Sequence, residues 1–459
     1  MKRMCCNYIF LFVLISLLLV FGLQAEDHFM DYIYLNHMIN VQEIPTLDIE
    51  RRRTAKAGSS EKNIECSNWE LVLKQAVSDN PGLKHSVWET LRPPYGAFDK
   101  IALHRVLREK RRHNKNRVIL MLPGTWEAAG WSTITQSRFN TLLYLANNGY
   151  DVYTLSYRSA YLPNLEYEQF ETLGIDISEI LDWNFGVFRE DIKACVEKIK
   201  KLSHAEKIFM SGFSRGATLM NIYASKYQTD LKGLVAFDGE IKDYGASGDP
   251  MDEATFAYVM DLVQAGMLAV PDGCNSVLCP PKGTFYQYLG ESSWENFENR
   301  QLAGAVPNAL NLAGAPLPSE FETLSDYIAA NAFVVWGEGA FSNYNNGAID
   351  KTALVTALSE FNRYWPTVQD FEWGQMTAWE DVPYLDYDDN EIDLPAIGFL
   401  TDLFCPYGYC IDPSIPNLTV NDDVTIYYLP DFGHMDVMYG NYSLAKVKEP
   451  LLNWLENHK

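Results

Sequence analysis

The stretch KIFMSGFSRGA, Lys207 to Ala217, decides the fold of this chain. Its apolar start, Lys207 to Ser211, is predicted to be a short strand, and Ala217 to Lys226 is predicted to be a helix. The turn between them reads G-x-S-x-G, with Ser214 at its centre. A strand, this turn and a helix form a nucleophile elbow, in which a strained backbone lifts one side chain clear. We therefore expect Ser214 to be an exposed nucleophile; the alternative is a tight turn with an unreactive serine.

Continuous apolar segments on both sides of this turn indicate a parallel sheet. The predicted strands are 117–122, 151–156, 207–211, 232–237, 395–401 and 423–429, and the predicted helices are 137–148, 189–202, 217–226 and 443–456. Strands that are apolar throughout and alternate with helices are typical of a mostly parallel α/β sheet with helices on both faces. Residues 98–108 alternate between apolar and polar, which predicts a half-buried strand.

The alternation of strands and helices divides the chain into segments. It is absent from residues 241–390, which we interpret as a large cap inserted over the sheet. Residues 98–240 and 391–459 are then the two parts of the core. Residues 26–97 are predicted to be an N-terminal extension, with a helix over 69–77.

The first 25 residues have the pattern of a secretory signal peptide. A basic start, an apolar segment over 8–23 and the small residue Ala25 before a polar stretch predict cleavage after Ala25. The alternative is an uncleaved membrane anchor, because the apolar segment approaches the ~20 residues that span a bilayer. We therefore expect a secreted or periplasmic protein without an integral membrane domain after cleavage, or an anchored one if the signal is retained.

The charge of the chain excludes some classes of partner. A formal net charge of −23 argues against nucleic acid or an anionic membrane surface. The acidic stretch Asp386 to Asp393 begins like a calcium-binding loop, but Glu391 stands where such a loop needs glycine. We interpret this stretch as a solvated connector, and no metal or cofactor is expected.

Six cysteines remain after removal of the signal peptide, an even number that fits a disulfide framework in an exported chain. Two short-spaced pairs would each close a small loop, and the other two cysteines pair only by elimination. The pairs are Cys274 with Cys279, Cys405 with Cys410, and Cys66 with Cys195. Cys195 also lies on the apolar face of a predicted helix, so a free buried thiol is the alternative there.

A serine nucleophile needs a histidine to take its proton. After Ser214 the chain has only His434 and His458. His458 is the penultimate residue, whereas His434 directly follows the predicted strand 423–429. We therefore expect His434 to be the general base.

The histidine in turn needs a carboxylate that fixes its tautomer. The leading candidate is Asp402, which ends the predicted strand 395–401. The second is Asp238, which ends the strand 232–237, and the acidic stretch or Asp436 are the remaining alternatives. Asp436 is better suited to orienting a loop, since it is only two residues from His434.

Two backbone N–H groups must also bind the oxyanion that forms on the substrate. One is expected from Arg215, the residue after the nucleophile. The other is expected from Thr125, in the loop after strand 117–122, with Trp126 as the alternative.

The order Ser214, Asp402, His434 on such a sheet resembles the α/β-hydrolase superfamily. Three further segments are similar to its acid-lipase-like esterases: Asp99 to Arg105, Asn148 to Val152, and Gly433 to Asp436 with Gly440. The similarity covers roughly 98–240 and 391–459. It implies a serine hydrolase that acts through an acyl-enzyme. With the predicted signal peptide and the aromatic, largely apolar cap, we expect an exported enzyme that cleaves a small or lipid-like carboxylic ester. The alternatives are a glycan-ester deacetylase, an amidase, or a binding protein that has lost the chemistry.

Overall fold

The structure is a computed structural model of the whole chain. It describes residues 69–242 and 391–459, apart from 79, 109–113, 126, 128, 130–139, 164–169, 171, 402–403, 431 and 441–442. Within the predicted cap it describes residues 362, 365, 366, 368, 369 and 372.

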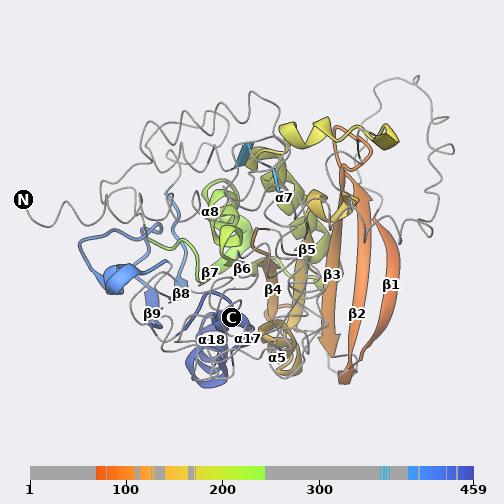
Figure 1. Cartoon of the computed structure of the whole chain (residues 1–459). Coiled ribbons are helices and arrows are strands. Elements are labelled where there is room, and N and C mark those ends of the chain that lie inside the picture. Colours follow the sequence, from red (N-terminus) through yellow and green to blue (C-terminus); the bar gives the residue numbers. More distant parts are fainter. Residues whose placement is uncertain are drawn as a thin grey trace, which may run out of the picture.

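One nine-stranded sheet runs through the described residues, in the order β1-β2-β3-β5-β4-β6-β7-β8-β9 (Figure 1). Strands β1, β2, β3 and β5 pair antiparallel, and the pairs from β5 through β4 to β9 are parallel. The strands are β1 (Glu70–Val77), β2 (Asn80–Leu91), β3 (Lys100–Arg108), β4 (Val118–Leu122), β5 (Asp151–Ser156), β6 (Ile208–Phe213), β7 (Leu231–Phe237), β8 (Ala396–Leu400) and β9 (Val424–Tyr428). The mostly parallel α/β sheet expected from the sequence is confirmed.

The helix predicted over 69–77 is wrong, because these residues form strand β1. β1 lies at the sheet edge and pairs antiparallel with β2, from Glu70 opposite Glu89 to Val77 opposite Asn80. Most of its side chains are exposed, so the backbone hydrogen bonds to β2 decide its conformation rather than an amphipathic pattern. Residues 70–91 therefore extend the core sheet, although the sequence assigned them to an N-terminal extension.

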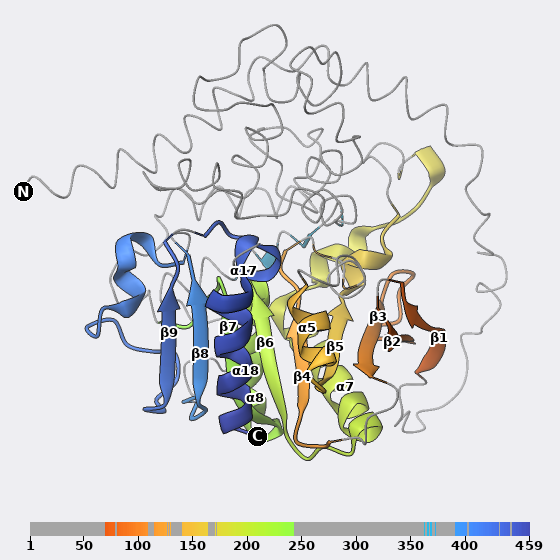
Figure 2. The ribbon, with the colours of Figure 1, turned by 90° about the horizontal axis from the view of Figure 1, so that it is seen from below.

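Helices cover both faces of the sheet, as Figures 1 and 2 show. On one face lie α7 (Phe185–Ser203) and α8 (Arg215–Tyr227). On the other lie α5 (Thr141–Asn147), α17 (Asp436–Tyr439) and α18 (Glu449–Asn457). Each face has its own buried apolar cluster, with Ile192 and Leu219 in the first and Leu142 and Leu451 in the second.

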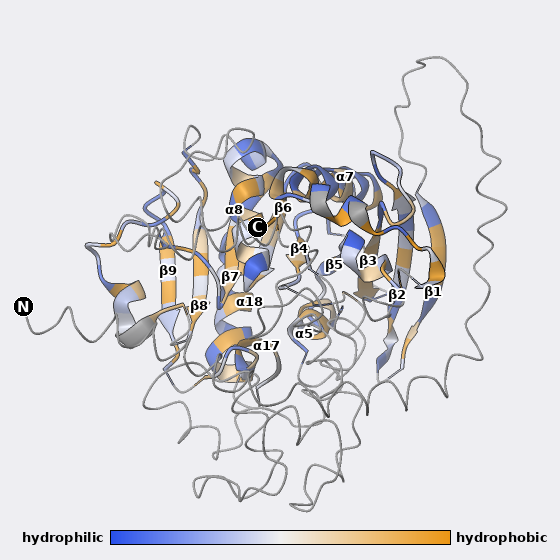
Figure 3. Cartoon of the chain, turned by 45° about the horizontal axis from the view of Figure 1, so that its top comes forward, coloured by the Kyte–Doolittle hydropathy of each residue, from blue (hydrophilic) through white to orange (hydrophobic). Residues whose placement is uncertain are grey.

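The centre of the sheet is its most apolar part. All side chains of β4, β5, β6 and β8 are buried, which explains why these segments are apolar without alternation. The outer strands β1 and β2 carry hydrophilic stretches instead (Figure 3). The parallel strands therefore form a rigid base for the residues that follow their carboxyl ends.

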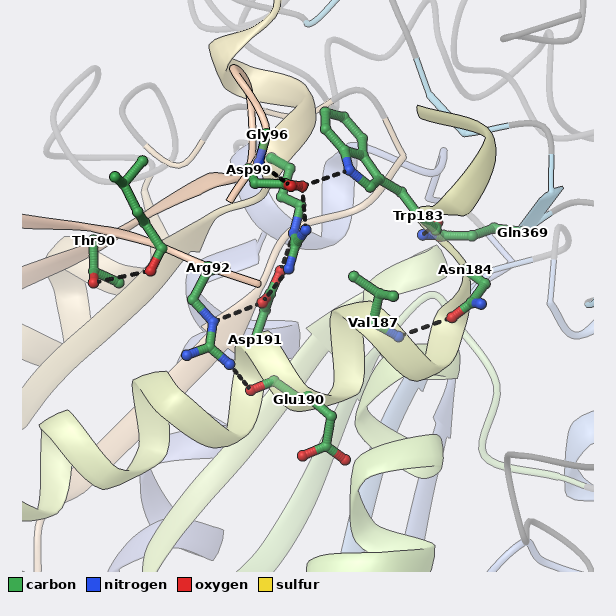
Figure 4. A network of polar contacts seen from close by, with 12 residues as sticks. Thr90, Arg92, Gly96, Asp99, Trp183, Asn184, Val187, Glu190, Asp191 and Gln369 are labelled. Carbon is green, nitrogen blue, oxygen red and sulfur yellow. Dashed lines mark hydrogen bonds and ion pairs between the residues drawn. The ribbon is translucent and has the colours of Figure 1, made fainter. Parts of the chain in front are cut away.

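A buried network of charges fastens the turn before β3 to helix α7 (Figure 4). Arg158 forms ion pairs with both Asp99 and Asp191, and Asp191 also accepts a hydrogen bond of 2.8 Å from Arg92. The indole N–H of Trp183 donates to Asp99 at 3.0 Å. Two guanidinium groups and two carboxylates thus neutralise each other inside the protein.

The cysteines follow part of the expected framework. Cys405 and Cys410 form a disulfide, as predicted. Cys195 is a free thiol, fully buried on α7, so its predicted pairing with Cys66 is wrong and the alternative of a buried thiol holds. Cys66, Cys274 and Cys279 lie outside the described residues.

Several predictions fall on residues that the structure does not describe. They are the signal peptide over 1–25, residues 26–68 of the extension, most of the cap over 241–390, Trp126, Asp402 and most of the acidic stretch 386–393. Among the described residues, none belongs to a helix with the length and apolarity that crossing a membrane requires.

Candidate active site

Ser214 occupies a strained turn between β6 and α8. Its backbone has φ 53° and ψ −127°, a region that residues other than glycine rarely adopt. The turn is fixed from both sides, because the Ser214 N–H donates to the carbonyl of Phe237 at 3.0 Å and its carbonyl accepts from Ala217 at 2.8 Å. This is the geometry of the predicted nucleophile elbow.

The two flanking glycines are required by close backbone contacts. A Cβ on Gly212 would lie 2.2 Å from the carbonyl oxygen of Gly216, and a Cβ on Gly216 would lie 2.2 Å from that of Leu122. No side chain fits such a space, so α8 can begin directly beside β4 and β6 only because both positions are glycine.

His434 lies in the loop between β9 and α17, next to this elbow. Its ring stacks on Phe213, the residue before Ser214, with ring centroids 4.5 Å apart. Phe404 faces the same ring at 6.1 Å. The side chain of His434 is 15% exposed, so aromatic contacts hold it while solvent or substrate can still reach it.

The carboxylate that contacts His434 is Asp238, at the end of β7. The distance from Asp238 Oδ2 to His434 Nδ1 is 2.6 Å. Thr401 holds the same carboxylate through its backbone N–H to Oδ1 at 2.6 Å and its hydroxyl to Oδ2 at 2.7 Å. Asp238 is fully buried, and these donors keep its carboxylate in one orientation.

The structure therefore favours the second of the two acids that the sequence proposed. Asp402, the leading candidate, lies outside the described residues, but its neighbour Thr401 points its hydroxyl at Asp238. Phe213 is paired with Phe237 in the parallel ladder, so Ser214 and Asp238 leave adjacent strands at the same edge. Adjacent strand ends of a parallel sheet are where such sites form.

The expected oxyanion loop also lies at this edge. Gly124 comes so close to the nucleophile that a Cβ there would be 3.1 Å from the Cβ of Ser214. Within the part of the chain that the structure describes, the N–H of the next residue, Thr125, has no hydrogen-bond acceptor. Arg215 begins α8 directly after Ser214. The two predicted donors are thus the chain neighbours of Gly124 and Ser214, which lie close together.

Two buried carboxyl groups close the loops of this site, and the sequence did not identify their contacts. Glu127 Oε2 accepts from the N–H of Gly124 at 2.6 Å, and Asp436 Oδ2 accepts from the N–H of Gly433 at 2.7 Å. Burial raises the pKa of Glu127 to about 8 and that of Asp436 to about 7. Asp436 thus fastens the loop that carries His434, which is the loop-orienting role the sequence suggested for it.

Residues of the predicted cap contact the same loops. Asn362 donates to the backbone carbonyl of Glu127 at 3.3 Å, and the carbonyl of Gln369 accepts from the guanidinium of Arg215 at 3.3 Å. Gln369 also donates to the carbonyl of Trp183 at 2.9 Å. This part of the insertion therefore lies against the nucleophile side of the core.

Comparison with solved structures identifies the fold. A candidate lipase from Sulfolobus solfataricus is similar with a TM-score of 0.59 and 24% sequence identity, over 85% of this chain and 99% of that one. The chain has the α/β-hydrolase fold. In this fold the turn with Ser214 directly follows β6, and the loop with His434 follows β9.

More distant structures are similar over a comparable share of the chain. A highly thermostable carboxyl esterase from Bacillus coagulans has a TM-score of 0.42 and 12% identity, covering 85% of this chain and 98% of that one. A thermophilic esterase from Thermogutta terrifontis has a TM-score of 0.40 and 11% identity, covering 85% and 100%. No family model matches the sequence, and no curated protein matches it either.

Proposed function

We propose that this α/β-hydrolase-fold protein is a serine hydrolase that cleaves carboxylic esters through an acyl-enzyme. The observation that carries the proposal is the 2.6 Å contact between Asp238 and His434, beside the strained elbow of Ser214. A histidine held by a buried carboxylate next to a partly exposed, strained serine is the arrangement that activates a hydroxyl as a nucleophile.

In the proposed reaction, Ser214 Oγ attacks the ester carbonyl while His434 Nε2 takes the hydroxyl proton. Asp238 accepts the Nδ1–H of His434, which sets the tautomer with a free Nε2 and stabilises the imidazolium. The N–H groups of Arg215 and Thr125 donate to the oxyanion of the tetrahedral intermediate. The intermediate collapses when the C–O bond to the alcohol breaks and His434 gives its proton to the leaving oxygen.

Water completes the cycle. His434 takes a proton from a water molecule, the resulting hydroxide attacks the acyl carbonyl, and the bond to Ser214 Oγ breaks as the proton returns to it. The carboxylic acid leaves and the triad is restored. Every proton moves through His434, so the reaction needs no cofactor for its balance.

The substrate class rests on the same site. Phe404 is only partly buried and faces His434, so it gives this side of the site an apolar surface, which suits an acyl chain or an apolar alcohol. The basic start and apolar segment of residues 1–25 support export as part of the proposal. Deacetylation of a glycan ester would use the same residues, and it is the second outcome that a substrate panel can give.

A fluorophosphonate probe tests the mechanism, because it labels only activated serines. The wild-type chain should be labelled, and Ser214→Ala should abolish labelling and hydrolysis of p-nitrophenyl esters while it keeps the thermal midpoint. Ser211→Ala is the matched control, since Ser211 lies three residues earlier in β6 and is fully buried. Equal labelling of the Ser214→Ala variant, or a wild-type chain that resists the probe, would refute the mechanism.

A further inference from the structure

We propose that Glu127 is a positioning residue that holds the oxyanion loop against Ser214. The inference rests on the proposed function, because it concerns the site at which the oxyanion forms. The hydrogen bonds of Glu127 involve no residue of the proposed triad directly.

The Glu127 side chain closes a tight turn around the loop. Its Oε2 accepts from the N–H of Gly124 at 2.6 Å, while its own N–H donates to the carbonyl of Gly124 at 3.3 Å. Residues 124–127 are therefore joined twice, once through the side chain and once through the backbone. The side-chain bond is the shorter of the two, and it occupies the N–H of Gly124.

This orientation selects which N–H group can bind the oxyanion. The Gly124 N–H is occupied by the carboxyl group, whereas the N–H of Thr125 has no acceptor in the described part of the chain. Gly124 is the position that comes close to Ser214, with little space for even a methyl group. A small rotation of the loop would move the Thr125 N–H by a distance that matters, since an error of about 1 Å in such a donor costs on the order of 10²-fold in rate.

The loop is also held at its other backbone atoms. The hydroxyl of Tyr157 donates to the carbonyl of Pro123 at 3.1 Å, and Asn362 donates to the carbonyl of Glu127. Trp365 packs its edge against Tyr157, with ring centroids 5.6 Å apart. Contacts thus fix both ends of residues 123–127, and the Glu127 carboxyl group fixes the middle.

Stability alone does not account for this carboxyl group. Glu127 is 3% exposed, and its second oxygen, Oε1, is buried without a hydrogen-bond partner among the residues that the structure describes. A half-satisfied buried carboxyl group costs free energy of folding. Burial keeps its pKa near 8, so the group is largely protonated at neutral pH and binds Gly124 as a neutral acceptor. Because this group, unlike a buried carboxyl group elsewhere in the protein, binds the loop beside Ser214, we expect its hydrogen bond to contribute to the reaction.

Two substitutions separate the hydrogen bond from the volume of the side chain. Glu127→Gln keeps an oxygen that can accept from Gly124, whereas Glu127→Leu fills the same space without an acceptor. We expect the leucine variant to lose about 10-fold or more in kcat with KM within about 3-fold, and the glutamine variant to stay within about 3-fold of wild type. The assay is steady-state hydrolysis of p-nitrophenyl butyrate.

A transition-state analogue gives a second readout. An aryl trifluoromethyl ketone forms a tetrahedral adduct with the serine and places an oxyanion in the hole. Its inhibition constant should rise in the leucine variant in parallel with the loss of kcat/KM, and should return toward wild type in the glutamine variant. A purely structural role would not produce this parallel.

Glu372 provides the matched control. It is another buried carboxyl group, and burial raises its pKa to about 8. One of its oxygens accepts from the backbone N–H of Phe185 at 2.7 Å, and the other has no partner within the described part of the chain. Glu372→Leu should change the thermal midpoint in the same direction as Glu127→Leu, but leave kcat within about 3-fold. If Glu127→Leu does not fold, Glu127→Asp, which draws the carboxyl group back by one methylene, should show the same loss of kcat.

The outcomes distinguish this inference from the proposed function. A wild-type chain that neither hydrolyses esters nor reacts with the ketone overturns both. An active wild-type chain in which Glu127→Leu keeps its kcat, or in which the leucine and glutamine variants lose kcat equally, overturns the positioning role and leaves the hydrolase intact. Equal loss of kcat in Glu372→Leu also overturns it.

Discussion

Replacing Asp238 by asparagine tests the choice of the acid. The variant keeps the shape of the side chain but has one oxygen where wild type has two. Thr401 donates its N–H to Oδ1 and its hydroxyl to Oδ2, and His434 Nδ1 lies 2.6 Å from Oδ2. The amide of an asparagine can be oriented in two ways, with its oxygen at the Oδ1 position and its NH₂ group at the Oδ2 position, or the reverse.

The buried backbone donor decides that choice. If the NH₂ group faced the N–H of Thr401, two donors would meet in a fully buried place, at a cost of roughly 1–3 kcal/mol. The amide oxygen therefore takes the Oδ1 position, and the NH₂ group donates to His434 Nδ1. The proton of the ring then moves to Nε2, the nitrogen that must accept the proton of Ser214.

The expected loss in kcat for Asp238→Asn is about 10³- to 10⁴-fold, which corresponds to roughly 4–5.5 kcal/mol of barrier. The assay is hydrolysis of a p-nitrophenyl ester together with the rate of fluorophosphonate labelling, on protein whose thermal midpoint has been checked. Asp402→Asn is the matched control and should stay within about 5-fold of wild type. A variant Asp238→Asn that keeps more than a tenth of its activity, while Asp402→Asn loses it, would refute the reasoning.

Two further predictions concern stability. His85 and His104 are buried against each other, with 3.0 Å between His85 Nε2 and His104 Nδ1, and burial lowers their pKa values to about 4 and about 3. In the unfolded chain a histidine takes up a proton below about pH 6.5, whereas these two rings stay neutral in the folded chain. The fold therefore loses stability as pH falls through that value, by about 2 kcal/mol per ring at pH 5. Glu127, Glu372 and Asp436 have raised pKa values, and they stabilise the fold as pH falls, so the test compares a variant with wild type. In urea denaturation, the unfolding free energy of His85→Gln relative to wild type should be about 2 kcal/mol higher at pH 5 than at pH 7.5. Equal pH profiles of the unfolding free energy would contradict this. For the disulfide, Cys405→Ala with Cys410→Ala should lower the unfolding free energy by about 2 kcal/mol and lower kcat, because the N–H of Cys405 binds the carbonyl of Thr401 and Phe404 faces His434. A reducing agent should reproduce both effects in wild type and have no effect on the double variant. A double variant with unchanged unfolding free energy and kcat would show that the disulfide is dispensable.

The sequence was sufficient to predict the turn at Ser214 and to select His434 as its neighbour because few alternatives existed. Ser214 stands in a turn whose glycines are enforced by backbone contacts of 2.2 Å, so its motif reports a steric requirement directly. His434 follows a strand and is one of only two histidines after the serine. Glycines that a turn requires, and a small number of candidate histidines, can both be recognised in a single sequence.

The choice between Asp238 and Asp402 needed the structure. Both residues follow apolar strands that are neighbours in the sheet, so strand position alone does not separate them. What distinguishes Asp238 is a set of hydrogen bonds from Thr401, a residue 163 positions away along the chain. Glu127 was missed for a similar reason, since a carboxyl group three residues after a glycine is common in turns.

Strand β1 was mistaken for a helix because its own side chains carry little information. Only Val77 in it is buried, and the strand exists through its hydrogen bonds with β2. Edge strands of this kind are decided by their partner rather than by their pattern.

The buried charge network of Figure 4 sets a limit on how far the chain can be shortened. Arg92 precedes residue 98, where the sequence placed the start of the core, yet it binds Asp191 on α7 and the carbonyl of Glu190. A chain trimmed to that point would keep Asp99, Asp191 and Arg158 but lose one of the two positive charges. The surplus negative charge would lie inside the protein, where an unpaired ion costs on the order of 3–5 kcal/mol. A shortened chain that keeps this buried network neutral must therefore begin before Arg92.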